Sequence, residues 1–175
     1  MHLFFFSEIY EFEDIQKLFS LFLLRFYNAL RTTTFHHPQN TEHFKEQLLQ
    51  WAQQFEEVVW LDSNQHNDTY SEYDAVLAVD AFTALKTDYF EAFDRLKDYQ
   101  TTTKDWVFGY LTYDLKNATE DLKSENFDGL EFPDVYMFQP KKLFLIKANQ
   151  IEIQYLKGVD DELKKDLLDI QNIER

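Results

Sequence analysis

Two apolar runs in the last third of the sequence constrain the fold most strongly, because only three residues separate them. Leu143 to Lys147 and Ile151 to Leu156 both have an alternating pattern, and Ala148-Asn149-Gln150 joins them. Parallel strands need a crossover of about a dozen residues or more, so this short link predicts an antiparallel β-hairpin. The fold should therefore contain antiparallel sheet.

Three further segments have the pattern of strands. Val58 to Leu61 is a short apolar run that ends at the polar segment from Asp62 to Thr69, and Trp106 to Tyr113 is a third candidate strand. Tyr73 to Val79 is apolar on both faces, which predicts a central strand that is covered on both sides. Gly109 weakens the strand that contains it unless the glycine permits a bulge or the close approach of another backbone.

Apolar residues at spacings of three and four predict helices over Thr41 to Glu56, Asp88 to Tyr99 and Asp160 to Ile170. Asn40 is a suitable N-cap for the first of these helices, and a shorter helix is expected over Asn117 to Leu122. The stripes expected to face the core are Phe44, Leu48, Trp51 and Phe55 in the first helix, Phe90, Phe93 and Leu96 in the second, and Leu163, Leu167 and Ile170 in the last.

Composition narrows the class of protein and of partner. With 18 Phe and 10 Tyr against three Gly, the chain of 175 residues favours a packed domain of strands and helices joined by short connections. A formal net charge of −15 opposes binding to nucleic acid, which requires clustered Lys and Arg. The absence of cysteine excludes disulfides and thiolate chemistry, and it fits a reducing compartment, so a cytoplasmic location is expected.

The first 30 residues are expected to be an appended amphipathic helix. Ile15, Leu18, Phe19, Phe22 and Phe26 recur at helical spacing, but Arg25 interrupts the apolar run, which is shorter than the roughly 20 residues that span a bilayer. Acidic residues precede the run where a secretory signal would carry positive charge. We therefore expect no membrane span. Two origins stay open: a genuine appended helix, or an upstream stretch translated in error.

The patterns together predict an α+β fold with a mainly antiparallel β-sheet packed with helices and an extra N-terminal helix. The expected organisation is an appended helix over residues 1–30, one domain over residues 31–157 and a C-terminal helix over residues 158–175.

Candidate reactive side chains form no catalytic constellation. The histidines His36, His37, His43 and His66 match no metal-ligand motif, and we expect them to be solvated or to cap helices. The carboxylates Asp62, Asp74 and Asp114 stand at strand ends, where such groups usually cap the backbone or face water. No catalytic residue and no metal site is predicted in this chain.

Several motifs together resemble a known family. In order, they are Trp60-Leu61-Asp62-Ser63, Val107-Phe108-Gly109-Tyr110-Leu111-Thr112-Tyr113-Asp114, Phe132-Pro133-Asp134-Val135-Tyr136 and an expected hairpin at Gln139-Pro140-Lys141-Lys142. They resemble the N-terminal domain of the chorismate-using synthases, most closely component I of aminodeoxychorismate synthase (the aminase component of para-aminobenzoate synthase), with component I of anthranilate synthase as a near relative. The resemblance covers about Arg31 to Leu156. Tyr110, Tyr113 and Asp114 are expected to be structural.

The resemblance implies a noncatalytic role. Enzymes of this family aminate chorismate with Mg²⁺ and with ammonia from a glutamine amidotransferase subunit, and the aminodeoxychorismate branch serves folate biosynthesis. The family's catalytic residues and its Mg²⁺ ligands belong to a downstream chorismate-binding domain. Because the sequence ends at Arg175, we expect a chain truncated before that domain, without a cofactor of its own and inactive alone.

The resemblance also implies a tryptophan pocket. In the family the matching strand, loop and strand hold tryptophan, so Ser63 would meet its polar end, and the walls would be Leu61, Tyr70, Ser71 and Tyr73. Such residue types suit an indole and its charged end. The alternative is that both tyrosines are ordinary sheet aromatics and that Ser63 forms a turn. At the level of the whole chain, the alternative is a stand-alone noncatalytic protein that binds an amino acid or a partner.

Overall fold

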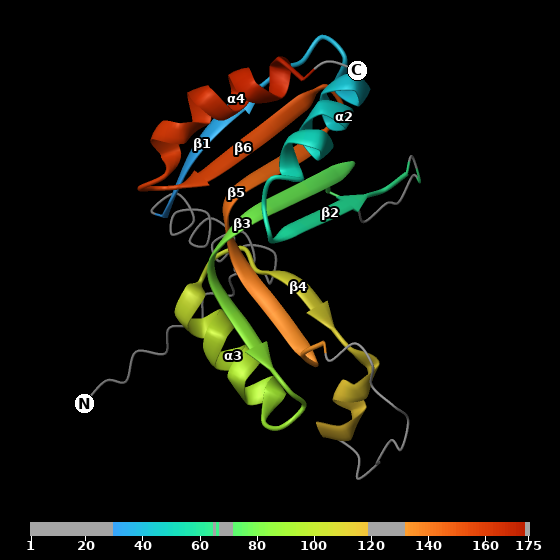
Figure 1. Cartoon of the computed structure of the whole chain (residues 1–175), viewed down its shortest axis with the longest axis vertical. Helices are drawn as coiled ribbons and strands as arrows, with labels where there is room; N and C mark the ends of the chain where they lie inside the picture. The colour runs from blue at the N-terminus through green and yellow to red at the C-terminus, as the bar shows by residue number, and fades with distance from the viewer. Residues whose placement is uncertain (1–29, 65, 67–71, 119–131, 174–175) are drawn as a thin grey trace, which may run out of the picture.

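The computed structural model describes residues 30–64, 66, 72–118 and 132–173, and within them the chain forms one six-stranded antiparallel sheet with three α-helices (Figure 1). The α+β prediction is therefore confirmed, whereas the helix expected before Leu30 lies outside the described residues. The strands are β1 (Arg31–His36), β2 (Val58–Asp62), β3 (Ala75–Thr87), β4 (Phe108–Leu111), β5 (Val135–Lys147) and β6 (Gln150–Leu156). The helices are α2 (Thr41–Ala52), α3 (Ala92–Thr103), α4 (Leu163–Gln171) and the 3-10 turns η1 (Tyr113–Ala118) and η2 (Asp160–Glu162).

The two longest strands, β3 and β5, run through the whole sheet. The strand order is β1-β6-β5-β3-β2, and β4 pairs with β5 beside the half of β5 that β6 does not reach. The upper part of the sheet in Figure 1 thus has five strands, and the lower part has β3, β5 and β4. The predicted β5–β6 hairpin is confirmed, with Lys147 paired to Gln150.

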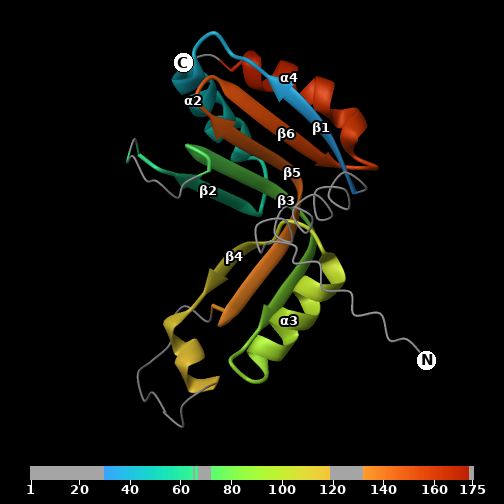
Figure 2. The ribbon, with the colours of Figure 1, turned by 180° about the vertical axis from the view of Figure 1, so that it is seen from behind.

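The long β3–β5 ribbon bends between these two parts (Figure 2). Asp80 has a left-handed φ of 62°, and the pairing register shifts between Ala81 and Thr83, which is how an extra residue bends a strand. On β5 the bend carries Pro140, which has no N–H to donate. The hairpin expected over Gln139 to Lys142 is wrong, since these residues lie within β5.

One face of the upper sheet is covered by α2 and α4 (Figure 1). The Asn40 side chain accepts a hydrogen bond from the backbone N–H of His43 at 3.0 Å, so the predicted N-cap is confirmed, although α2 ends at Ala52 rather than Glu56. The predicted stripes of α2 and α4 also face this core. The largest fully buried members of the cluster are Leu48, Leu77, Phe144, Ile146, Ile151, Ile153, Tyr155 and Ile170.

Lys142 anchors α4 to the sheet through buried charges. Its ammonium lies 2.6 Å from an Asp166 carboxylate oxygen and 2.7 Å from Glu162, and Tyr155 donates a hydrogen bond to Asp166 at 2.9 Å. Burial would lower the pKa of Lys142, but the hydrogen bonds and charges of Asp166 and Glu162 outweigh it and raise the pKa. Lys142 therefore stays charged in the fold.

A second buried ion pair ties the start of β1 to the segment between α3 and β4. The guanidinium of Arg31 binds Asp105 through Nε and Nη2 at 2.8 Å each, and both side chains are 1% exposed. Arg31 also donates to the Pro140 carbonyl at 2.6 Å, and Gln139 donates to Asp105 at 2.7 Å. All four residues meet close to the bend.

The second helix differs from the prediction. It spans Ala92 to Thr103 instead of Asp88 to Tyr99, because Asp88 accepts a hydrogen bond from the N–H of Phe90 and Glu91 is left-handed. Consequently Phe90 and Phe93 are exposed, and α3 attaches through Tyr99, which donates to the Thr83 carbonyl at 2.9 Å and accepts from the Gln139 N–H at 3.0 Å. Among the described residues, no helix has the length and apolar character required to cross a bilayer.

Candidate functional site

Three of the five residues predicted to hold tryptophan line one cavity. Leu61 and Ser63 lie at the end of β2, Tyr73 lies just before β3, and together they border a cavity of about 290 Å³. Tyr70 and Ser71 lie outside the described residues. The β2–β3 pairing brings these segments together, since Asp62 pairs with Ala75 and the Ser63 N–H donates to the Asp74 carbonyl at 2.9 Å. Leu61 keeps 55% of its surface exposed, so the cavity is open on that side.

The carboxylate of Asp62, next to Ser63, is already paired with the ammonium of Lys45. Asp62 lies 2.8 Å from the Lys45 ammonium and accepts a hydrogen bond from the N–H of Asn64 at 2.8 Å. The hydrogen bond from Lys45, followed by the one from Asn64, lowers the pKa of Asp62 against the opposing effect of burial. An amino group bound beside Ser63 would therefore compete with Lys45 for this carboxylate.

Tyr73 is a neutral, half-buried wall of this cavity. Burial, with smaller contributions from the charges of Glu72 and Glu152, raises the pKa of its phenol to about 12. The ring also packs against the apolar cluster around Leu143 and Leu145 on the second face of the sheet. Tyr73 can thus offer an aromatic surface at neutral pH without carrying charge.

Two of the other candidate side chains, Asp74 and His36, make structural contacts. Asp74 accepts a hydrogen bond from the N–H of Ala148 at 2.6 Å and so caps the β5–β6 turn. The ring of His36 lies 5.1 Å from that of Phe44, and burial, with the charge of His37, lowers the pKa of His36. Within residues 30–64, 66, 72–118 and 132–173, no group of three His, Asp or Glu is arranged to hold a metal ion.

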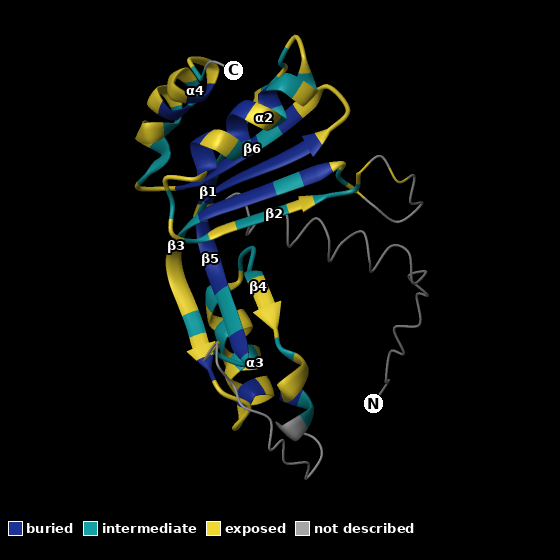
Figure 3. Cartoon of the chain, turned by 45° about the vertical axis from the view of Figure 1, so that its right-hand side comes forward, coloured by how far each residue is buried: buried dark blue, intermediate teal, exposed yellow. Residues whose placement is uncertain are grey.

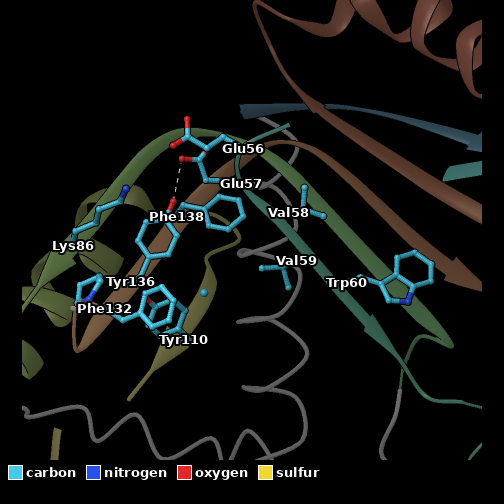
Figure 4. Close-up of a pocket in the computed structure, with 12 residues that line it drawn as sticks. Glu56, Glu57, Val58, Val59, Trp60, Lys86, Tyr110, Phe132, Tyr136 and Phe138 are labelled. Carbon is cyan, nitrogen blue, oxygen red and sulfur yellow. Dashed lines mark hydrogen bonds between the residues drawn. The ribbon is translucent and has the colours of Figure 1, made fainter. Parts of the chain in front are cut away.

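A larger cavity, here called the junction cavity, was not predicted from the sequence. It has a volume of about 590 Å³ and lies between β2 and the lower parts of β3, β4 and β5 (Figure 4). Four separate segments of the chain line it. They are Glu56–Trp60, Lys86, Gly109–Tyr110 and the group formed by Phe132, Pro133, Tyr136 and Phe138.

Strand register places a row of side chains across the floor of the junction cavity. Lys86 on β3 pairs with Tyr136 on β5, and Tyr136 pairs with Tyr110 on β4, so the three side chains project from the same face. The Lys86 ammonium lies 4.7 Å from the centre of the Tyr136 ring, and the rings of Tyr136 and Tyr110 are 5.8 Å apart. Phe132 extends the row with an edge contact to Tyr110 at 6.3 Å.

Two glutamates lie at one end of this row. Tyr136 donates a hydrogen bond to Glu57 at 3.1 Å, which orients that carboxylate toward the cavity (Figure 4). Burial, then the hydrogen bond to Glu57 and its charge, raises the pKa of Tyr136 to about 12. Tyr136 therefore remains a neutral donor over the physiological pH range.

The substitution Glu57→Gln should lower the pKa of Tyr136, because it removes the negative charge of Glu57, while burial and the charges of Glu56 and Tyr110 still raise the pKa. The raised pKa means that the contribution of Tyr136 to stability is complete below its ordinary pKa of 10.0 and is lost as the pH rises through about 12. At a pH of about 11 the variant should show more phenolate absorbance than the wild type. Asp98→Asn, which makes the same charge change on α3, should leave the titration unchanged; identical curves for Glu57→Gln and wild type would contradict the assignment.

Gly109 permits the close strand contact beside the junction cavity. A Cβ atom at this position would lie 1.9 Å from the Tyr136 carbonyl oxygen, and its φ of +154° is one that other residues rarely adopt. The expectation that a glycine in this strand allows close approach of another backbone is confirmed.

No model of a known protein family matches this chain. A search among curated proteins likewise finds no match.

Proposed function

We propose that this chain is the N-terminal, noncatalytic part of a chorismate-aminating synthase of the aminodeoxychorismate component I type. The observation that carries the proposal is the cavity at the end of β2, where Leu61, Ser63 and Tyr73 meet. They are three of the residues that the motif resemblance assigns to tryptophan. The antiparallel sheet with helices on one face is compatible with an anthranilate synthase-like N-terminal domain.

The exposed aromatic side chains further support a scaffold role. Large apolar groups on a protein surface often mark places where another domain or protein packs. In the lower part of the structure, exposed side chains lie on both sides of the β3–β5 ribbon (Figure 3). They are Phe82, Tyr89, Phe90 and Phe93 near α3, and Leu111 and Tyr113 near β4. The proposed partners are the chorismate-binding catalytic domain and, through it, a glutamine amidotransferase subunit.

In this proposal the small cavity holds tryptophan. The indole would lie against Leu61 and Tyr73, and Ser63 would offer a hydroxyl to the charged end of the amino acid. The volume of about 290 Å³ is near the lower end of the roughly 300–1,000 Å³ typical of ligand pockets.

Tryptophan should raise the melting temperature of the chain, because a ligand that binds only the folded state stabilises it by mass action. Ser63→Ala should weaken tryptophan binding about tenfold or more, since a hydrogen bond to a charged group contributes about 1.5–3 kcal/mol. Thermal denaturation with and without tryptophan measures the first effect, and titration calorimetry measures the second. Thr102→Ala, an exposed site on α3, is the matched control. Absence of any heat at millimolar tryptophan, with the fold intact, would remove this part of the proposal.

The synthase assignment itself is tested by reconstitution. The chain alone should not consume chorismate, but addition of a chorismate-binding catalytic domain of this family, glutamine amidotransferase and Mg²⁺ should yield an aminated chorismate at a rate above that of the catalytic domain alone. If the chain binds an amino acid as a stable monomer and has no effect on the catalytic domain, the alternative holds: a stand-alone amino-acid-binding or interaction protein.

A further inference from the structure

The junction cavity has unpaired charge of both signs around an aromatic floor. Among the described residues, Glu56, Glu57 and Lys86 form no ion pair, and the ammonium of Lys86 lies over the Tyr136 ring. Among the described residues, the lining thus contains two carboxylates and one ammonium, a net negative charge. The formal charge of −15 on the whole chain adds to the attraction for cations.

The aromatic row offers surfaces of the kind that bind an apolar stem and an ammonium. Tyr110 is 39% exposed and Phe132 is 62% exposed, so both rings have uncovered area at the end of the row away from the glutamates (Figure 4). Lys86 on Tyr136 is an internal example of the attraction between an ammonium and these rings. A ligand that lies along the row could therefore place its apolar part on Tyr110 and Phe132.

The glutamate end of the row is preorganised for a hydrogen-bond donor. The Tyr136 hydroxyl holds one oxygen of Glu57 at 3.1 Å, and a carboxylate has capacity for further donors. Glu56 is exposed next to it and carries no described hydrogen bond that would need to break. A charge-assisted hydrogen bond from an ammonium is the strongest contact that such a carboxylate can make with a small ligand.

From this arrangement we propose that the junction cavity binds a primary amine carried on an aromatic stem, with its ammonium at Glu57 and Glu56 and its ring on Tyr110 and Phe132. The site is separate from the cavity at Leu61 and Ser63, and the proposal does not depend on the synthase assignment. The Lys86 ammonium lies over the Tyr136 ring beside this site, so its positive charge would repel the bound ammonium.

The test is a calorimetric titration of the whole chain with three ligands of similar shape. 2-Phenylethylamine should bind, 2-phenylethanol should bind at least tenfold more weakly because it lacks the charge, and phenylalanine should also bind more weakly because its carboxylate faces Glu57. Equal binding of the alcohol would show that the cavity selects only apolar shape, and this result would overturn the proposal. So would a lack of heat from the amine at a concentration on the order of 10 mM.

Four variants test where the amine binds and whether the cavity selects a positive charge. Glu57→Gln retains the acceptor for Tyr136 and should weaken amine binding about tenfold or more, whereas Asp98→Asn, with the same charge change outside the cavity, should not affect it. Glu56→Gln, at an exposed position, gives a second measurement if Glu57→Gln does not fold. Lys86→Met should strengthen amine binding several-fold. If phenylalanine binds most tightly, the cavity recognises a carboxylate, and the proposal is wrong. If Lys86→Met abolishes binding of the amine, Lys86 supports binding instead of opposing it, and this result also contradicts the proposal.

The tryptophan site and the junction cavity are distinguished by a cross-check. Ser63→Ala should leave binding of 2-phenylethylamine unchanged, and Glu57→Gln should leave tryptophan binding unchanged. Each proposal can therefore fail without the other.

Discussion

Replacement of Asp105 with alanine is expected to lower the free energy of unfolding by about 3–5 kcal/mol, because it leaves the guanidinium of Arg31 buried without its counter-charge. The two side chains are each 1% exposed, so water cannot replace the lost carboxylate without opening the structure. Gln139 loses an acceptor in the same variant. Urea denaturation followed by circular dichroism measures the change.

The exposed pair of Lys165 and Asp169 is the control for this prediction. Their charged atoms are 3.9 Å apart, and their side chains are 81% and 50% exposed. Asp169→Ala removes a carboxylate from an ion pair as Asp105→Ala does, but solvated pairs of this kind often contribute nothing measurable. If the two variants had equal stability, the Arg31–Asp105 pair would not be the connection that holds β1 near the bend.

Gly109→Ala is the second substitution for which we expect a large effect, a loss of about 2–5 kcal/mol. The positive φ would cost an alanine about 1–2 kcal/mol, and insertion of a carbon into a packed site costs about 1–3 kcal/mol. The new Cβ would overlap the Tyr136 carbonyl, a backbone atom that cannot rotate away. The strands β4 and β5 must therefore separate.

Gly158→Ala separates the cost of the positive φ from the cost of the steric overlap. Gly158 also has a positive φ, +104°, but a Cβ there would have no neighbour within 4 Å. Its loss should be only the conformational part, about 1–2 kcal/mol. Thermal or chemical denaturation of both variants gives the comparison, and a Gly109→Ala variant no less stable than Gly158→Ala would contradict the predicted overlap.

The sequence predicts correctly those parts of the fold that depend on residues close together in the chain. Asn40 correctly indicates the start of α2, and the short link after Lys147 correctly indicates the hairpin. The prediction did not recognise β1, because Arg31–His36 is polar and threonine-rich and is held by pairing with β6, which is distant in sequence. It also missed the lower half of β3, whose exposed residues show no apolar alternation.

The lower half of β5 was missed for a related reason. Pro140 and two lysines normally indicate a turn, but here they occupy the bend, where β5 needs no N–H at Pro140 and where Lys141 binds Asp80 at 2.9 Å. The two cavities differ in the same respect, because one could be predicted from the sequence and the other could not. Leu61, Ser63 and Tyr73 could be selected by motif, whereas the junction cavity is assembled by the register of three strands, which no single segment encodes.

The place of β5 in the sheet has a consequence for synthesis on the ribosome. β5 spans Val135–Lys147 and pairs with β3, β4 and β6, so three neighbours depend on it. Because translation proceeds from the N-terminus, β3 and β4 emerge before β5, the strand that pairs with both of them. Until β5 is synthesised, their aromatic side chains stay exposed in an incomplete nascent chain. Exposed strands and apolar groups in such a state favour aggregation. Yield of this protein in cells should accordingly depend on chaperones that hold the early strands until β5 leaves the exit tunnel.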